Sequence, residues 1–243
     1  MTAITVVDHL VVAAGSLEQG VAWCESTLFV TPQAGGEHPL MGTHNRILRI
    51  ATAKFSRAYL EIIAIDPQAA APRRKRWFDL DDPALREGIR RKPRLVHFVA
   101  SCERVGAASS ALDSLGIDRG PMLAAQRETP GAVLRWKISV RDDGQRLFYG
   151  ALPTLIEWDG AHPSESLPES GLSLLSLTAT HPRPDDLFAA YRAIHLEQVG
   201  IDAGSPNLSA RLMTPLGEVT LESGGCRCSA TSRSAARCRR CIP

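Results

Sequence analysis

The chain has 243 residues, of which 44% are hydrophobic and 22% are charged, and its formal net charge is +2. This composition excludes collagen-like, coiled-coil and fully disordered chains, and the length allows one large domain or two of moderate size. No apolar run approaches the roughly 18 residues that a membrane helix needs, and the N-terminus lacks the pattern of a secretory signal. We therefore expect a cytoplasmic protein with no membrane partner.

The positive charge is concentrated near the C-terminus. The stretch from Cys226 to Pro243 contains five arginines, no acidic residue and four of the six cysteines. The rest of the chain carries 23 basic and 26 acidic residues, so its charge gives no reason to expect a nucleic-acid partner. Its two cysteines, Cys24 and Cys102, are typical of a cytosolic protein rather than a disulfide framework. We predict that residues 225–243 form a disordered tail, and zinc binding by its cysteines is the alternative.

The first 66 residues have the pattern of a β-α-β-β-β unit. Apolar and β-branched residues at 6–12 predict a strand buried on both faces. Ser16 begins an S-x-x-Q capping box, after which apolar residues recur at helical spacing. Strand-like stretches follow at 46–50 and 59–65, and turn-forming residues separate them.

Residues 67–93 are predicted to be a linker. They begin with prolines and alanines, and the basic run at 73–76 stands directly before Trp77 and Phe78. A basic run beside aromatic residues can bind nucleic acid. We favour the commoner alternative, a solvated connector whose aromatic side chains anchor it to the body of the protein.

Two further units, residues 94–160 and 171–224, repeat this order. The helix of the first ends at Gly116, and the helix of the second opens with Pro184, followed by two aspartates that suit the helix dipole. The strand-like stretches that close these units are 133–140, 154–158, 209–213 and 218–221. The repeat therefore predicts an α+β fold.

Two of the three units place a histidine in the first strand and a glutamate in the last. His9 precedes Glu61 by 52 residues, and His97 precedes Glu157 by 60. A carboxylate within an apolar strand costs several kcal/mol unless it is paired, protonated or bound to a metal. The third unit has Ser176 in place of the histidine, so we predict no site there.

Strand alternation turns His9 toward the face of Val11 and Glu61 toward the face of Ile63. If the two strands are neighbours, the imidazole and the carboxylate converge on one concave face. Two facing units would then offer two histidines and two glutamates, which can hold a divalent metal and leave positions open for substrate or water. The alternative is that the histidines are hydrogen-bonded core residues and that Glu157 is partly solvated at a strand end.

The sequence resembles the glyoxalase-like domain proteins of the vicinal-oxygen-chelate superfamily. The resemblance covers most of residues 4–200 and rests on the motifs Asp8-His9-Leu10-Val11-Val12, Met41-Gly42-Thr43-His44-Asn45, Tyr59-Leu60-Glu61-Ile62-Ile63, Trp77-Phe78-x-Leu80-Asp81-Asp82-Pro83 and Leu155-Ile156-Glu157-Trp158-Asp159-Gly160. It implies that paired β-α-β-β-β modules form a curved mixed sheet, a cup with the helices outside. It also implies metal ligands in the first and last strands of two paired modules, at His9, Glu61, His97 and Glu157.

The resemblance leaves two functional classes. The first is an enzyme in which a divalent metal (zinc, nickel, manganese or iron) holds a small oxygen-rich substrate, with Glu61 or Glu157 as general base. Its chemistry would be that of a lyase or isomerase or, with iron, of a dioxygenase. The second class is a metal-free binding or resistance protein with the same cup, in which His9 and Glu61 form a buried hydrogen-bonded pair.

Three further residues are predicted to line the substrate pocket: His44, Asn45 and Trp158. The first two follow a Gly-rich stretch, residues 35–39, that we expect to be a loop at the rim of the sheet. The alternatives are a third histidine ligand or a simple turn at His44 and Asn45, and a core position for Trp158. Three units leave one half-cup unpaired, with an exposed apolar face and sheet edge. We therefore expect that the third unit either packs beside the first two or mediates a homodimer, and dimerisation is the remedy we favour for the exposed face.

Overall fold

The computed structural model describes residues 4–129 and 132–224. The first unit contains β1 (Val6–Ala13), α1 (Leu17–Leu28), β2 (Gln33–His38), β3 (Thr43–Arg49) and β4 (Tyr59–Ile65). The second contains β5 (Arg94–Ser101), α3 (Val105–Asp113), β6 (Met122–Thr129), β7 (Ala132–Ser139), the 3₁₀ helix η1 (Leu147–Gly150) and β8 (Thr154–Trp158). The third contains β9 (Ser173–His181), α5 (Pro184–Ala193), β10 (Gly200–Ala203), β11 (Asn207–Thr214) and β12 (Gly217–Glu222). The tail predicted at 225–243 lies outside the described residues.

The connecting segments add two helices, α2 (Pro83–Arg91) and α4 (Pro163–Ser166). Within the described ranges, no helix has the length and the apolar character needed to cross a membrane.

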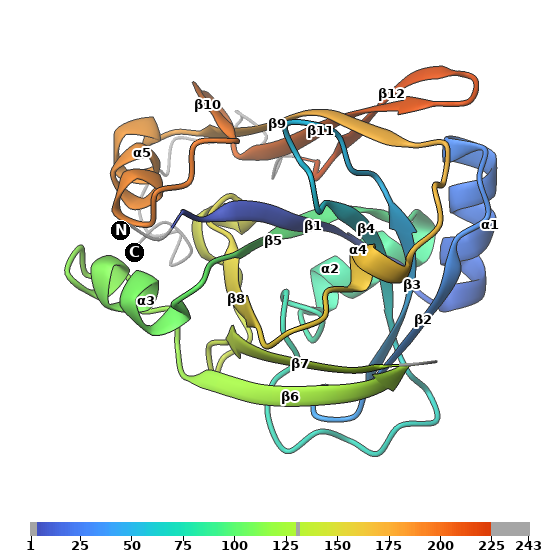
Figure 1. The fold of residues 1–243 in the computed structure, drawn as a ribbon, viewed down its shortest axis with the longest axis horizontal. Coiled ribbons are helices and arrows are strands. Elements are labelled where there is room, and N and C mark those ends of the chain that lie inside the picture. The colour runs from blue at the N-terminus through green and yellow to red at the C-terminus, as the bar shows by residue number, and fades with distance from the viewer. Residues whose placement is uncertain (1–3, 130–131, 225–243) are drawn as a thin grey trace.

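The first two units form one eight-stranded sheet with the order β2-β3-β4-β1-β5-β8-β7-β6 (Figure 1). Inside the first unit β1 pairs with β4 in parallel, and inside the second unit β5 pairs with β8 in parallel. An antiparallel pairing of β1 with β5 joins the two units. The predicted α+β fold, in which paired modules share a curved mixed sheet, is confirmed.

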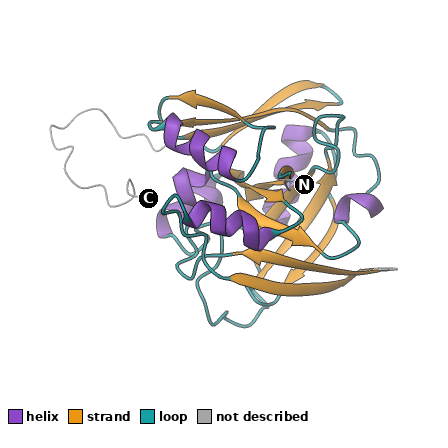
Figure 2. Ribbon diagram, turned by 60° about the vertical axis from the view of Figure 1, so that its left-hand side comes forward, coloured by secondary structure: helices purple, strands orange, loops and turns teal. Residues whose placement is uncertain are grey.

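The third unit forms a separate sheet, β10-β9-β11-β12, which packs against the outer face of the large sheet. Apolar side chains such as Leu177 of β9 and Ala210 of β11 share a core with Leu10 of β1. In Figure 2 this small sheet lies at the top, with helices between it and much of the large sheet. The other face of β9 carries half-buried polar side chains such as Ser176 and Thr178. Of the two arrangements expected for the third unit, packing beside the first two is the one observed, and its apolar face is buried within the chain.

The linker is more structured than the sequence predicted. It contains α2, which begins after Asp82; the Asp82 carboxylate accepts a hydrogen bond from the backbone N–H of Leu85, and Pro83 occupies the first turn. Trp77 and Phe78 are buried on the inner face of the large sheet, which confirms their predicted role as anchors. The linker thereby fills part of the cup.

Residues 35–38 belong to strand β2, not to the loop that their glycines predicted. The side chains of Asn45 and Arg127 lie over Gly35 and Gly36, respectively, and a Cβ atom on either glycine would collide with them. Glycine is needed here because two side chains cross the strand closely, rather than because the chain turns.

Candidate functional site

The inner face of the large sheet holds a pocket with an empty volume of about 450 Å³, counting the space at its open mouth. Both units and the linker contribute to its wall. The aromatic lining consists of Tyr59, Trp77, Phe78, Trp136 and Trp158, and the polar lining of His9, His38, Asn45, Glu61 and Arg127. A broad apolar wall with a few convergent polar groups is typical of a small-molecule site.

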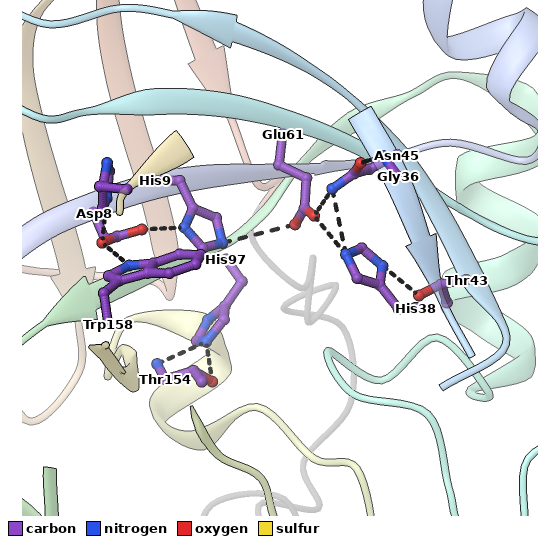
Figure 3. Close-up of polar contacts among 11 residues, drawn as sticks. Asp8, His9, Gly36, His38, Thr43, Asn45, Glu61, His97, Thr154 and Trp158 are labelled. Carbon is purple, nitrogen blue, oxygen red and sulfur yellow. Dashed lines mark hydrogen bonds and ion pairs between the residues drawn. The ribbon is translucent and has the colours of Figure 1, made fainter. Parts of the chain in front are cut away.

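A β-bulge in β1 brings Asp8 and His9 together. The register of β1 with β5 shifts between Val7 and His9, so Asp8 is the extra residue. Adjacent side chains of a regular strand point to opposite faces, whereas these two are in contact (Figure 3). His9 Nδ1 donates a hydrogen bond to Asp8 Oδ1 at 2.7 Å. This leaves His9 Nε2 on the pocket side, toward Glu61.

Asp8 is fully buried, and two more donors bind its carboxylate. Trp158 Nε1 and His162 Nε2 donate to Asp8 Oδ2 at 2.9 and 3.0 Å. Burial by itself raises the pKa of Asp8, but the hydrogen bonds from His162 and His9 outweigh it and hold this pKa well below its usual value. Asp8 is therefore an ionised acceptor, which fixes His9 in the form with its proton on Nδ1.

Glu61, on the neighbouring strand β4, points into the same pocket as His9. Its Oε2 lies 3.8 Å from His9 Nε2. Its Oε1 accepts a hydrogen bond from Asn45 Nδ2 at 2.5 Å, and Asn45 Oδ1 accepts one from the backbone N–H of Gly36 at 2.7 Å. The expected convergence of His9 and Glu61 from adjacent strands is confirmed.

His38, at the end of β2, lies on the other side of Glu61 (Figure 3). Its Nε2 is 4.0 Å from Glu61 Oε1, and its Nδ1 is 3.1 Å from the hydroxyl of Thr43. Burial, and then the positive charge of Arg127, lowers the pKa of His38 to about 3. His38 is therefore a neutral imidazole at physiological pH.

His97 is not brought into the pocket. It is fully buried, its Nδ1 donates to the carbonyl oxygen of Gly150 at 3.0 Å, and its Nε2 accepts from the backbone N–H of Thr154 at 3.1 Å. The ring of Phe78 from the linker lies against it, with 5.2 Å between the ring centres. Because both nitrogens are engaged, His97 is a hydrogen-bonded core histidine, the alternative to a metal ligand.

Glu157 lies on the opposite face of β8 from the pocket. Its Oε2 accepts a hydrogen bond from the backbone N–H of Val105, the first residue of α3, at 2.9 Å. Its Oε1 is 3.4 Å from Lys137 Nζ. A carboxylate in this place stabilises the N-terminus of a helix. Its neighbours Ile156 and Trp158 line the pocket instead.

The four predicted metal ligands therefore do not surround one point. The second unit turns Trp136, Ile138, Ile156 and Trp158 toward the pocket, none of which is a metal ligand. Across the part of the chain that the structure describes, no group of three or more His, Cys, Asp or Glu side chains is arranged to hold a metal ion. His9 and Glu61 are of suitable types, but the residues present do not fit the four-ligand site.

Of the predicted substrate-binding residues, Asn45 and Trp158 line the pocket. His44 does not, because it alternates with Asn45 and faces the other side of β3.

Four polar residues of the site were not predicted from the sequence: Asp8, His38, Arg127 and His162. Asp8 had a usable signal, since the cost of a carboxylate in an apolar strand applies to it as it does to Glu61. His38 and Arg127 lie in strands whose bounds the pattern did not predict. His162 caps the short helix α4 in the segment between units, and nothing local indicates its contact with Asp8.

Comparison with known proteins gives a family match. The model of a family described as a glyoxalase-like domain matches residues 7–195. No curated protein matches the chain.

Solved structures with a similar fold include a hypothetical protein from Staphylococcus aureus, which is 11% identical with a TM-score of 0.54 over 90% of this chain and 85% of that one. A methylmalonyl-CoA epimerase from Streptomyces coelicolor, in complex with 2-nitronate-propionyl-CoA, is 16% identical over 65% of this chain and 99% of its own, with a TM-score of 0.39. A methylmalonyl-CoA epimerase from Mycobacterium tuberculosis is 16% identical over 64% and 87%, with a TM-score of 0.36. At 11% identity the likeness to the Staphylococcus aureus protein concerns the fold alone.

Proposed function

Because the chain belongs to the glyoxalase-like domain family, we propose that its cup binds a small oxygen-rich organic molecule and moves a proton on it. His9 is the acid–base residue of this proposal. The observation that supports it is the Asp8–His9 pair, in which a buried carboxylate holds the imidazole with Nε2 open to the pocket. General acid–base catalysis by a positioned histidine contributes roughly 10²–10⁴-fold.

The proposed step starts at a C–H bond next to a carbonyl group of the bound molecule. His9 Nε2 takes the proton, and the electron pair of the C–H bond forms an enolate. The proton then returns to the same or a neighbouring carbon, which is isomerase-type chemistry. Asp8 stabilises the imidazolium through the 2.7 Å hydrogen bond, and Glu61 adds a second negative charge 3.8 Å away.

Hydrogen–deuterium exchange tests the proposal. The protein is incubated in D₂O with a panel of small 2-oxo acids, hydroxyketones and 1,2-dicarbonyls, and NMR follows the loss of each C–H signal. We expect faster exchange of at least one compound with the native protein than with His9→Gln, which cannot take the proton. His44→Gln, on the far face of β3, is the matched control and should exchange like the native protein. Equal exchange with the native protein and His9→Gln would contradict the proposal.

Binding without chemistry is the second candidate function, and the aromatic wall of the pocket favours it. Three of the four tryptophans, Trp77, Trp136 and Trp158, line the pocket, so their fluorescence should report a bound ligand. A pure binding protein would bind its ligand in the native form but would exchange no C–H proton, either in the native form or as His9→Gln.

A divalent ion held by His9 and Glu61 stays a prediction. It is supported by the ligand types and by Asp8, since a metal-binding histidine often donates the N–H of its other ring nitrogen to a carboxylate. It lacks the support of His97 and Glu157, which lie elsewhere. Metal analysis of protein purified without a His-tag tests it. About one ion per chain that survives dialysis, and is lost in Glu61→Gln, would favour the metal-dependent enzyme over the metal-free step.

The homodimer and the cytoplasmic location also stay predictions. The apolar face that suggested a dimer is buried against the large sheet, so the exposed edges of β10 and β12 are what still supports it. Sedimentation at micromolar concentration distinguishes a dimer from a monomer.

A further inference from the structure

Arg127 of β6 brings a positive charge to the pocket, and among the described residues this charge has no carboxylate partner. Its side chain lines the pocket, and its Nε is buried without a hydrogen-bond partner among the described residues. No described carboxylate forms an ion pair with it. A buried guanidinium donor is costly unless something accepts its hydrogen bonds.

A glycine in β2 makes room for the side chain of Arg127 in the pocket. Strands β2 and β6 are the two ends of the large sheet, and they approach each other at its lower right in Figure 1. Arg127 crosses between them and lies over Gly36, where a Cβ atom would come within 2.5 Å of Arg127 Cδ. Glycine at position 36 therefore allows the guanidinium to lie against the backbone of β2.

The charge of Arg127 acts on the polar side of the pocket. It contributes to lowering the pKa of His38, and it opposes the rise that burial causes in the pKa of Tyr59. Because His38 is neutral, Arg127 is the side chain among the described lining residues that always carries a positive charge. Glu61 is the carboxylic acid among them.

From these observations we infer that Arg127 binds the carboxylate of a small organic acid, whose planar apolar part lies against Trp136 and Trp158. The inference rests on the proposed function and narrows its ligand to carboxylic acids. A guanidinium with a free Nε offers the two parallel N–H donors that a carboxylate accepts in a bidentate manner. Glu61 in the same pocket disfavours a dianion such as a phosphate monoester, because like charges repel.

The test compares 3-phenylpropionate with its neutral amide, 3-phenylpropionamide, at equal ionic strength. Tryptophan fluorescence and calorimetry measure both affinities. We expect the native protein to bind the acid about tenfold more tightly than the amide, which corresponds to about 1.4 kcal/mol. Arg127→Met should abolish this preference. The matched control is Arg135→Met, which removes the same charge from an exposed position on the adjacent strand β7 and should keep the preference.

Two further variants keep the test decisive if Arg127→Met unfolds. Arg127→Lys retains the charge but not the paired donors, so part of the preference should remain. Gly36→Ala leaves Arg127 in the sequence but displaces its guanidinium, so it should weaken binding of the acid and leave binding of the amide unchanged. A purely structural role for Arg127 would alter both affinities together.

The outcomes separate this inference from the proposed function. Equal binding of acid and amide, or a preference that survives Arg127→Met, overturns the inference and leaves a ligand-binding pocket. Tighter binding of 2-phenylethylphosphonate than of 3-phenylpropionate overturns the assignment to carboxylates. If neither acid nor amide binds, both the inference and the proposed binding of such molecules are wrong.

Discussion

Asp8 determines how the pocket histidine is presented. A buried carboxylate is costly in isolation, but His9, Trp158 and His162 all donate hydrogen bonds to this one. Trp158 and His162 lie 150 and 154 residues further along the chain. The orientation of His9 and the docking of the second unit onto β1 therefore depend on the same side chain.

Asp8→Asn should lower the free energy of unfolding by roughly 1–3 kcal/mol, because an amide cannot accept the three hydrogen bonds that the carboxylate accepts. It should also slow C–H exchange as His9→Gln does, since the tautomer of His9 is no longer fixed. Thermal unfolding and NMR exchange measure the two effects. Asp159→Asn, at an exposed position, is the control. An unchanged melting temperature for Asp8→Asn would contradict the central role given to this carboxylate.

His97→Gln tests whether His97 is a core residue or a ligand. Burial, and then the charges of Arg119 and Arg146, lowers the pKa of His97 well below its usual value, so the folded state holds it neutral. The stability that comes from the neutral form of His97 is fully present above the pKa of a histidine in the unfolded chain, about 6.5. This stability is lost as the pH falls below that value.

Urea unfolding at pH 7.5 and at pH 5.5 measures this effect. The native protein should lose stability between the two values, and His97→Gln should be less stable at pH 7.5 but lose less on acidification. Ligand binding in the pocket should not change. Loss of binding with no change in stability would restore His97 to the site.

Sequence patterns located one half of the site and not the other, for a reason visible in single residues. Regular alternation holds along β4, so the inward direction of Glu61 could be predicted. In β5 the pairing with β1 passes from His97 directly to Leu95, and the extra residue Val96 forms a bulge. Such a shift cannot be predicted from alternation.

At the level of elements, the linker explains why the second unit lacks a polar site. Trp77 and Phe78 enter the cup, and α2 buries Leu85 and Ile89 in the same inner core. Packed apolar groups therefore occupy the part of the cup into which a second histidine–glutamate pair would have to point. The sequence showed that the aromatic residues anchor the linker, but which surface they cover depends on long-range packing.

Glu157→Gln should destabilise the protein by roughly 0.3–1 kcal/mol, because the carboxylate stabilises the N-terminus of α3 through the Val105 N–H. The affinity for 3-phenylpropionate and the rate of C–H exchange should stay at native values. Chemical unfolding and the fluorescence titration measure these quantities. A loss of exchange without a loss of stability would show that Glu157 acts in the pocket after all.

For the whole molecule, the three repeats are used in two different ways. Two of them share one sheet and form the cup, whereas the third places its apolar face on the outside of that sheet. Tyr191 of α5 strengthens this docking, since its buried hydroxyl donates to the carbonyl oxygen of Ala151 in the second unit. The repeat was visible in the sequence. The sequence did not show whether a unit would extend the shared sheet or pack on its outer face, because that depends on which apolar faces come into contact in the folded chain.

Removal of residues 226–243 should leave the melting temperature, ligand binding and metal content unchanged. The stretch has Ile242 as its single bulky aliphatic residue and no aromatic residue, so it can bury little to offset an ordering cost of roughly 1–2 kcal/mol per residue. Its four cysteines can still bind zinc or form intermolecular disulfides during purification. Under reducing conditions, the melting temperature, ligand binding and metal content of the full chain are compared with those of a chain that ends at Gly225. A melting temperature several degrees lower in the shorter chain, or the loss of one zinc per chain, would show that the cysteines stabilise the fold.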